Sequence, residues 1–204
     1  MKTKAFVIAV TGLVALACTP KALPDWTEEE AMLIWDCEGV MPVLTVQDSL
    51  ELKVLRAEAA ELSDADLLSD TYSRLASLMV ATVTSPEQDG VGIAGPQVGI
   101  SRRVVAVQRF DKEGEPFEVY PDIRITAFRG ENVEGPEGCL SVPGLRGMVP
   151  RSRDIDISYK IIRCGTVKDT TERVQGFTAV IFQHETDHLD GILYTDKAVS
   201  VSPR

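Results

Sequence analysis

Both histidines of this 204-residue chain lie within one five-residue segment, 184–188, which reads H-E-T-D-H. Apolar residues precede the first histidine at helical spacing: Phe177, Val180 and Ile181. This periodicity predicts an amphipathic helix that begins near Gly176 and ends at Gly191, because glycine is common just beyond a helix C-terminus. Both histidines then fall on the buried side of that helix, which constrains how the rest of the chain can pack.

Two imidazoles four residues apart stack on one helix face and can hold a single metal ion. Glu185 is then placed to take a proton from a water molecule. The alternative is a pair of core histidines satisfied by hydrogen bonds. A catalytic site of this kind needs a third ligand, yet no histidine remains and no Glu follows His188. We therefore expect that ligand upstream, where segment 137–141 (E-G-C-L-S) offers the thiolate of Cys139, a suitable ligand for zinc or ferrous iron.

Helical signals precede a β-rich region. A capping box that begins at Thr27 predicts a short helix over 27–35, and Ser63 opens a longer one that ends at Ser85-Pro86. Residues 91–159 are rich in strand formers. The order helix, sheet, helix predicts an α+β fold in which the last helix packs against the sheet.

Within the β-rich region, residues 103–108 predict a buried strand, and residues 155–159 alternate in the manner of a half-exposed strand. Glycine and proline cluster at 90–99 and at 135–150, so we expect loops there. The first of these segments contains G-V-G-I-A-G-P-Q, which lacks the Lys-Ser/Thr of a phosphate-binding loop. Its glycines instead suit a loop that lines a peptide cleft.

Residues 1–18 resemble an export signal: two lysines, an apolar run over 5–17, and Cys18 after small residues. This pattern predicts a bacterial lipoprotein anchored to a membrane through a lipidated Cys18; a plain secretory signal and a buried strand are the alternatives. We expect residues 19–40 to form a tether and residues 41–204 to form the catalytic domain.

Composition narrows the class of protein further. Apolar residues make up 44% of the chain and charged residues 25%, as in ordinary globular domains. The formal net charge of -10 argues against nucleic-acid binding. In an oxidising compartment Cys37 and Cys164 could pair; two separate thiols are the alternative.

The three segments G-V-G-I-A-G-P-Q, E-G-C-L-S and Q-H-E-T-D-H-L occur in the order and spacing of peptide deformylase, and residues 41–197 resemble that family. The resemblance implies antiparallel sheets around a central C-terminal helix that carries the H-E-x-x-H motif. It also implies removal of the formyl group from N-formylmethionyl peptides. The implied cofactor is one divalent metal ion, Fe²⁺ first, with Zn²⁺, Ni²⁺ or Co²⁺ as alternatives.

The family's roles transfer to matching positions. Cys139, His184 and His188 would bind the metal, Glu185 would act as general base, and the Gln97 amide with the Leu140 N–H would stabilise the oxyanion. The implied substrate-binding residues are Gly92, Ile93, Glu137, Gly138, Arg146, Phe177, Val180 and Ile181. Among these, Ile93, Phe177, Val180 and Ile181 would form the methionine pocket, with core packing as the alternative for all four.

The chain also departs from the family pattern. Gly95 stands where the family usually has alanine, and Tyr120 where it often has asparagine. The export signal, and the absence of the long C-terminal helix with which some members dock on the ribosome, predict a deformylase that works outside the cytosol without ribosome binding. Two other readings stay open: a lipoprotein that binds formyl peptides without turnover, and an H-E-x-x-H amidase or protease of altered specificity.

Overall fold

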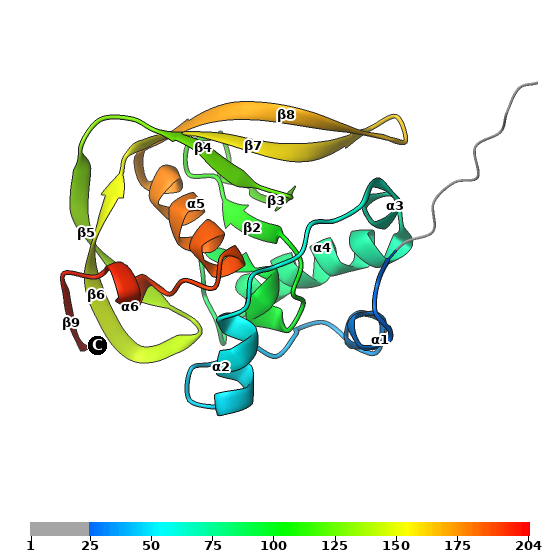
Figure 1. Ribbon diagram of the computed structural model, residues 1–204, viewed down its shortest axis with the longest axis horizontal. Coiled ribbons are helices and arrows are strands. Elements are labelled where there is room, and N and C mark those ends of the chain that lie inside the picture. Colours follow the sequence, from blue (N-terminus) through cyan, green and yellow to red (C-terminus); the bar gives the residue numbers. More distant parts are fainter. Residues whose placement is uncertain (1–24) are drawn as a thin grey trace, which may run out of the picture.

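The computed structural model describes residues 25–204 of the chain (Figure 1). The predicted signal segment and the lipidation site at Cys18 lie outside the described residues. Within the described part, no helix is long and apolar enough to cross a membrane.

Nine strands form three antiparallel sheets in the described part of the chain (Figure 1). The first sheet contains β1 (Gly92–Ala94), β2 (Val104–Gln108) and β3 (Phe117–Pro121). The second contains β4 (Arg124–Phe128), β7 (Asp154–Arg163) and β8 (Thr166–Gln175). The third contains β5 (Asn132–Cys139), β6 (Val142–Ser152) and β9 (Ser200–Pro203).

Helix α5 (Gly176–Leu189) lies in the middle of the molecule and contacts strands of all three sheets (Figure 1). It ends as expected: Gly191 has a φ of +69°, and a Cβ there would lie 2.4 Å from the Arg56 carbonyl oxygen. Only glycine fits such a conformation and such a close approach. The predicted α+β class, with antiparallel sheets around the helix that carries both histidines, is confirmed.

The hydrophobic core has two main parts, one on each side of the first sheet. Helix α4 (Asp70–Val83) contributes Leu75 and Met79 to one part, and α5 contributes Ala179 and Phe182 to the other. Strand β2 supplies side chains to both, which explains why four of its five residues are buried. The predicted buried strand at 103–108 and the half-exposed strand at 155–159 are both confirmed.

Two local predictions were wrong. The single helix expected over 63–85 is divided into α3 (Asp64–Leu67) and α4, because the Ser69 side chain caps α4 at the Tyr72 N–H. The loop expected at 135–150 is mostly strand: β5 and β6 form a hairpin in which Gly135 pairs with Val149. The glycines of this segment weaken the strand pattern in the sequence because they add no side chains to the sheet surface. Their backbone groups still pair across the hairpin.

The described part of the predicted tether is packed against the domain. Helix α1 (Glu28–Trp35) has the expected capping box at Thr27 and contacts α4 through the fully buried Ile34. Glu30 also accepts hydrogen bonds from Arg102 at 2.8 Å. Helices α2 (Ser49–Leu55) and α6 (Tyr194–Lys197) were not expected.

Cys37 and Cys164 are both free thiols in the structure. Cys37 is half-buried beside the α1–α4 core, whereas Cys164 is exposed at the turn between β7 and β8. The suggested disulfide between them is therefore absent.

Candidate metal centre and catalytic cleft

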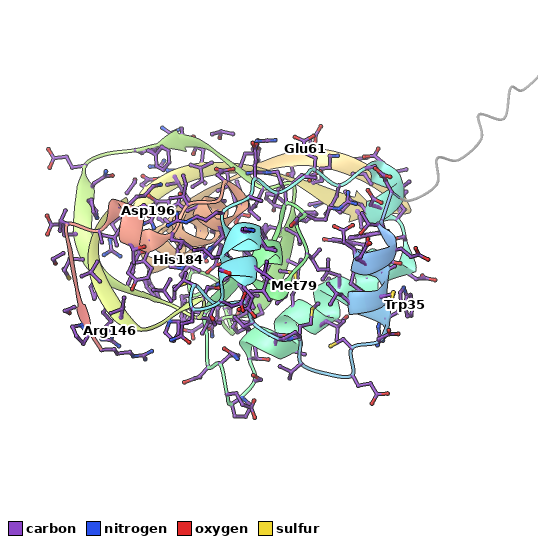
Figure 2. All side chains as sticks on the ribbon, turned by 60° about the horizontal axis from the view of Figure 1, so that its bottom comes forward. Trp35, Glu61, Met79, Arg146, His184 and Asp196 are labelled. Carbon is purple, nitrogen blue, oxygen red and sulfur yellow. The ribbon has the colours of Figure 1, made fainter. Side chains whose placement is uncertain are left out.

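Helix α5 brings both histidines next to the end of β5, where Cys139 lies. One potential ligand atom from each of Cys139, His184 and His188 lies within 4.8 Å of the other two. The Cys139 Sγ is 3.2 Å from the His188 Nε2. Figure 2 shows that His184 and Arg146 lie at the end of the molecule opposite Trp35. The two histidines and the upstream thiol are thus together, as the sequence predicted.

The electrostatics of this cluster favour a bound cation. Burial alone would raise the pKa of the Cys139 thiol, but the neighbouring His188 and His184 lower it well below its ordinary value. Burial opposes protonation of His184, yet contacts with Cys139 and Glu137 raise its pKa well above the usual range. The Cys139 thiolate therefore carries a negative charge beside two imidazoles. A divalent ion held by these three groups would be stabilised by that charge.

Glu185 lies beside this cluster without a hydrogen-bond partner for its buried Oε2 in the described part of the chain. Burial raises its pKa to about 7. Gly92 on β1 makes room for it, since a Cβ there would come 2.5 Å from the Glu185 Oε1. A carboxyl group with a pKa near neutrality can both accept and return a proton, as a general base must.

Gln97 is held over the cluster by the short helix η1 (Gly95–Val98). Its Oε1 accepts a hydrogen bond from the Ala94 N–H at 2.9 Å, which fixes the orientation of the amide. Its Nε2 then faces the Ser141 hydroxyl at 3.2 Å and the Cys139 Sγ at 3.5 Å. An amide fixed in this way can donate a hydrogen bond to an oxygen beside Cys139.

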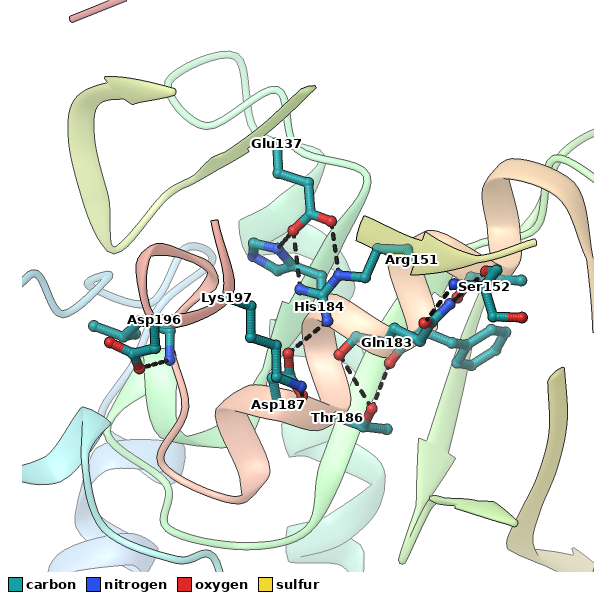
Figure 3. Close-up of polar contacts among 12 residues, drawn as sticks. Glu137, Arg151, Ser152, Gln183, His184, Thr186, Asp187, Asp196 and Lys197 are labelled. Carbon is teal, nitrogen blue, oxygen red and sulfur yellow. Dashed lines mark hydrogen bonds and ion pairs between the residues drawn. The ribbon is translucent and has the colours of Figure 1, made fainter. Parts of the chain in front are cut away.

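Buried charges support His184 from behind (Figure 3). The His184 Nδ1 is 2.9 Å from the Glu137 Oε2, and Arg151 donates hydrogen bonds to both oxygens of that carboxylate. Burial works against ionisation of Glu137, but His184 and Arg151 outweigh it and lower its pKa to about 2. A carboxylate only accepts, so Nδ1 carries the hydrogen and Nε2 is left for the metal.

The same network continues to the C-terminal part of the chain. Arg151 also donates to Asp187 at 2.6 Å, and Lys197 donates to the other oxygen of Asp187 at 2.6 Å. The sequence pattern did not predict Arg151, Asp187 or Lys197, and it indicated Glu137 only as a substrate contact. The signal that could have revealed this network is the general rule that a metal-binding histidine has a carboxylate or carbonyl partner on its other nitrogen.

The cluster opens into a cleft of about 440 Å³, a volume that suits a small ligand or peptide end. Most of the predicted site residues line it: Gly92, Gln97, Glu137, Gly138, Cys139, Leu140, Arg146, Phe177, Val180, Ile181, His184 and Glu185. Ile93 does not. It is fully buried in the core beside α4, because side chains alternate along β1 and the Gly92 position faces Glu185.

The donor set passes a simple test for a resident metal. A thiolate and two imidazoles suit Zn²⁺ or Fe²⁺, and an open cleft leaves room for water or substrate. A lowered thiol pKa and a correctly oriented His184 tautomer are what metal binding requires. The geometry thus defines a metal-dependent hydrolase.

Comparisons with known proteins agree. Residues 40–204 match the family model described as polypeptide deformylase. The peptide deformylase of Desulforudis audaxviator is 38% identical over 152 residues, which is 74% of this chain and 91% of that protein. The chain belongs to the peptide deformylase family, and the predicted resemblance is confirmed.

Solved structures show the same fold. The Met-Ala-Ser-bound class I type b peptide deformylase of Acinetobacter baumannii has a TM-score of 0.67 at 36% identity, covering 78% of this chain and 98% of that one. The actinonin-bound structure of the same enzyme has a TM-score of 0.66 at 37% identity, covering 78% and 99%.

Proposed function

We propose that this protein hydrolyses the formyl group from N-formylmethionyl peptides, giving formate and a free N-terminal methionine, and that it does so outside the cytosol. The observation that carries the reaction is the meeting of Glu185, Gln97 and the Cys139–His184–His188 cluster in one cleft. The Acinetobacter baumannii relative, which holds Met-Ala-Ser, supports this substrate class, because that tripeptide is what remains after formate leaves formyl-Met-Ala-Ser.

Cys139, His184 and His188 would hold one divalent ion, which when bound supplies a Lewis acid and lowers the pKa of water. Glu185 takes the proton of the attacking water at its carboxylate and later passes it to the departing amine. Gln97 Nε2, with the Leu140 N–H, donates hydrogen bonds to the oxygen that becomes negatively charged as the formyl carbon turns tetrahedral. Burial of Glu185 suits both of its tasks, since it keeps the pKa near 7.

The peptide would lie between β1 and β5 as an added strand, with Gly92 and Gly138 leaving space for its backbone. Its methionine side chain would enter the apolar part of the cleft beside Phe177, Val180 and Ile181. Arg146 lines the same cleft and would contact the following residues.

Formate release tests the reaction directly. Purified protein loaded with Ni²⁺ receives formyl-Met-Ala-Ser, beside a Glu185→Gln control that keeps the size of the side chain. We expect turnover in the parent chain and a loss of at least about 100-fold in the variant. Tight peptide binding without formate would favour a binding lipoprotein, and cleavage at internal peptide bonds would favour an altered amidase or protease.

The location is supported by the sequence of residues 1–18, with its lysines, apolar run and Cys18. We expect the expressed chain to incorporate radiolabelled palmitate and to sediment with membranes. A Cys18→Ala variant should lose the label. An unlabelled parent chain in the cytosolic fraction would overturn both the anchor and the export.

We propose Fe²⁺ as the native metal, since thiolate and imidazole ligands accept it. Fe²⁺ and its Cys139 ligand are both open to oxidation in air. We expect iron-loaded enzyme to lose activity over hours in air, whereas Ni²⁺-loaded enzyme keeps it. Full retention of activity by the iron form would contradict this expectation.

A further inference from the structure

A second, smaller cavity adjoins the methionine end of the cleft. Its volume is about 150 Å³, and Phe177, Val180, Pro136 and Glu137 line both it and the main cleft. The two cavities therefore share one wall, formed by the first turn of α5 and by β5. A ligand side chain that packs against Phe177 and Val180 in the main cleft would lie next to this second cavity.

The far side of the second cavity is part apolar and part cationic. Val133 and Val149 line it together with Arg151 and Arg153. The two arginines differ in their partners. Arg151 is fully engaged by Glu137 and Asp187.

Arg153 has no ion-pair partner among residues 25–204. The carboxylate next to it in sequence, Asp154, accepts a hydrogen bond from Arg173 at 2.8 Å instead. Arg153 is half-buried in a chain that carries 31 acidic residues against 21 basic ones. The carboxylate that lines the cavity, Glu137, is engaged by Arg151, so the half-buried Arg153 can donate hydrogen bonds to a ligand there.

Gly135 leaves room for this guanidinium. A Cβ on Gly135 would lie 3.1 Å from the Arg153 Nη2, so any side chain there would press on the arginine. The backbone of Gly135 is ordinary strand paired with Val149, and its φ does not require glycine. The absence of a side chain at position 135 therefore matters for the space that Arg153 occupies.

We propose that Arg153 and Gly135 extend the methionine pocket into a site for a side chain that carries a hydrogen-bond acceptor near its end, so that the enzyme deformylates peptides beginning with formyl-methionine sulfoxide. This inference rests on the proposed deformylase function. Methionine sulfoxide has the shape of methionine plus one polar oxygen, which an apolar pocket leaves without a partner. Arg153 supplies that partner, and the valines of the cavity accept the terminal methyl group.

Three peptides test the inference: formyl-Met-Ala-Ser, its methionine sulfoxide form, and its norleucine form, which has no sulfur or oxygen in the side chain. We expect Arg153→Leu to lower kcat/KM for the sulfoxide peptide about tenfold, while the other two peptides change less than about twofold. Gly135→Ala should cause the same selective loss to a smaller degree. Arg163→Leu, which removes an exposed arginine at the far end of β7 and outside the cavity, serves as the matched control and should leave the ratio unchanged.

Binding of the product peptides provides a second reading that needs no turnover. The parent chain should bind Met(O)-Ala-Ser and Met-Ala-Ser with similar affinity, and Arg153→Leu should weaken only the former, by about tenfold. An equal loss for all peptides, or an unchanged ratio in the variant, would overturn the inference. Failure of every formyl peptide to react, with selective sulfoxide binding intact, would overturn the proposed function and leave this pocket assignment standing.

Discussion

Two buried arginines flank helix α5, and their neighbourhoods differ in one respect. Arg151 lies on the face that carries His184 and Asp187, whereas Arg109 lies 5.7 Å from the Phe182 ring on the opposite face. The exposed fractions of the two residues are only 3% and 1%. Both are bound by at least two acidic side chains.

The difference lies in the further contacts of the acidic residues that bind each arginine. Glu137, the partner of Arg151, also orients His184 toward the metal position. Arg109 is bound by Asp111, Glu118 and Glu172. Glu118 and Glu172 also contact Lys112 and tyrosine side chains, and none of the three acids is hydrogen-bonded to Cys139, His184 or His188 in the described part of the chain. Similar chemistry therefore supports a catalytic ligand on one face of α5 and only the packing of the fold on the other.

Removing Arg109, the centre of the cluster that supports packing only, should have the largest effect, and that effect should be on stability. Arg109→Met removes a buried guanidinium that binds three partly exposed carboxylates, so we expect the free energy of unfolding to fall by about 3 kcal/mol. The kcat/KM of the folded fraction should not change. Urea unfolding and formate release measure the two quantities. Arg129→Met, which breaks an exposed pair with Asp156, should cost much less stability; a large loss of kcat/KM in Arg109→Met would break the comparison.

A methyl group added at Gly92, which faces the cleft side of α5, should affect activity rather than stability. In Gly92→Ala the new Cβ would come 2.5 Å from the Glu185 Oε1 and would displace the base. We expect kcat to fall about 100-fold, because a small displacement of a reacting group is costly. Metal content should stay the same. Unchanged kcat would show that Glu185 has another route to the same position.

Replacing one carboxylate in each arginine cluster with a neutral amide tests the difference between the two clusters further. Glu137→Gln removes the charge that orients His184, so we expect metal affinity to fall about 10- to 100-fold. Glu118→Gln, in the Arg109 cluster, is the matched control and should leave metal affinity unchanged. Competition with a chelator gives both affinities. Equal losses in the two variants would mean that Glu137 has no special role.

The smallest expected effect is a loss of stability at acid pH. A hydrogen bond from Arg109 lowers the pKa of Asp111, so this carboxylate stabilises the fold above its unfolded pKa, near ~4. That contribution is lost as the pH falls through the lowered folded value. We therefore expect the urea midpoint to fall below about pH 4 in the parent chain, and to fall less in Arg109→Met. Parallel pH profiles for the two proteins would contradict the assignment.

Local patterns predicted much of this molecule because their causes are local. The Thr27 capping box, the alternation at 155–159 and Gly191 each depend on near neighbours in sequence. The division at Ser69 was missed because an internal serine cap competes with a continuous apolar stripe. Strand β8 was missed because most of its residues are polar and exposed, with no strong strand signal.

The site was predictable where chemistry has few solutions, and less so where partners come from afar. Two histidines and one suitably placed cysteine left little choice of ligands. Arg151 and Lys197 join the site through Asp187, a contact that depends on how β6 and α6 pack on α5. Ile93 was misplaced because its face of β1 is set by the neighbouring Gly92, which the sequence pattern alone does not orient.

A cobalt titration tests most directly whether Cys139, His184 and His188 form one metal site. The metal-free protein receives Co²⁺ while its absorption spectrum and bound metal are recorded, with Cys139→Ser as the comparison. We predict one equivalent of Co²⁺ per chain and a thiolate-to-metal charge-transfer band that disappears in the variant. Binding without that band, or no saturation at one equivalent, would contradict the site.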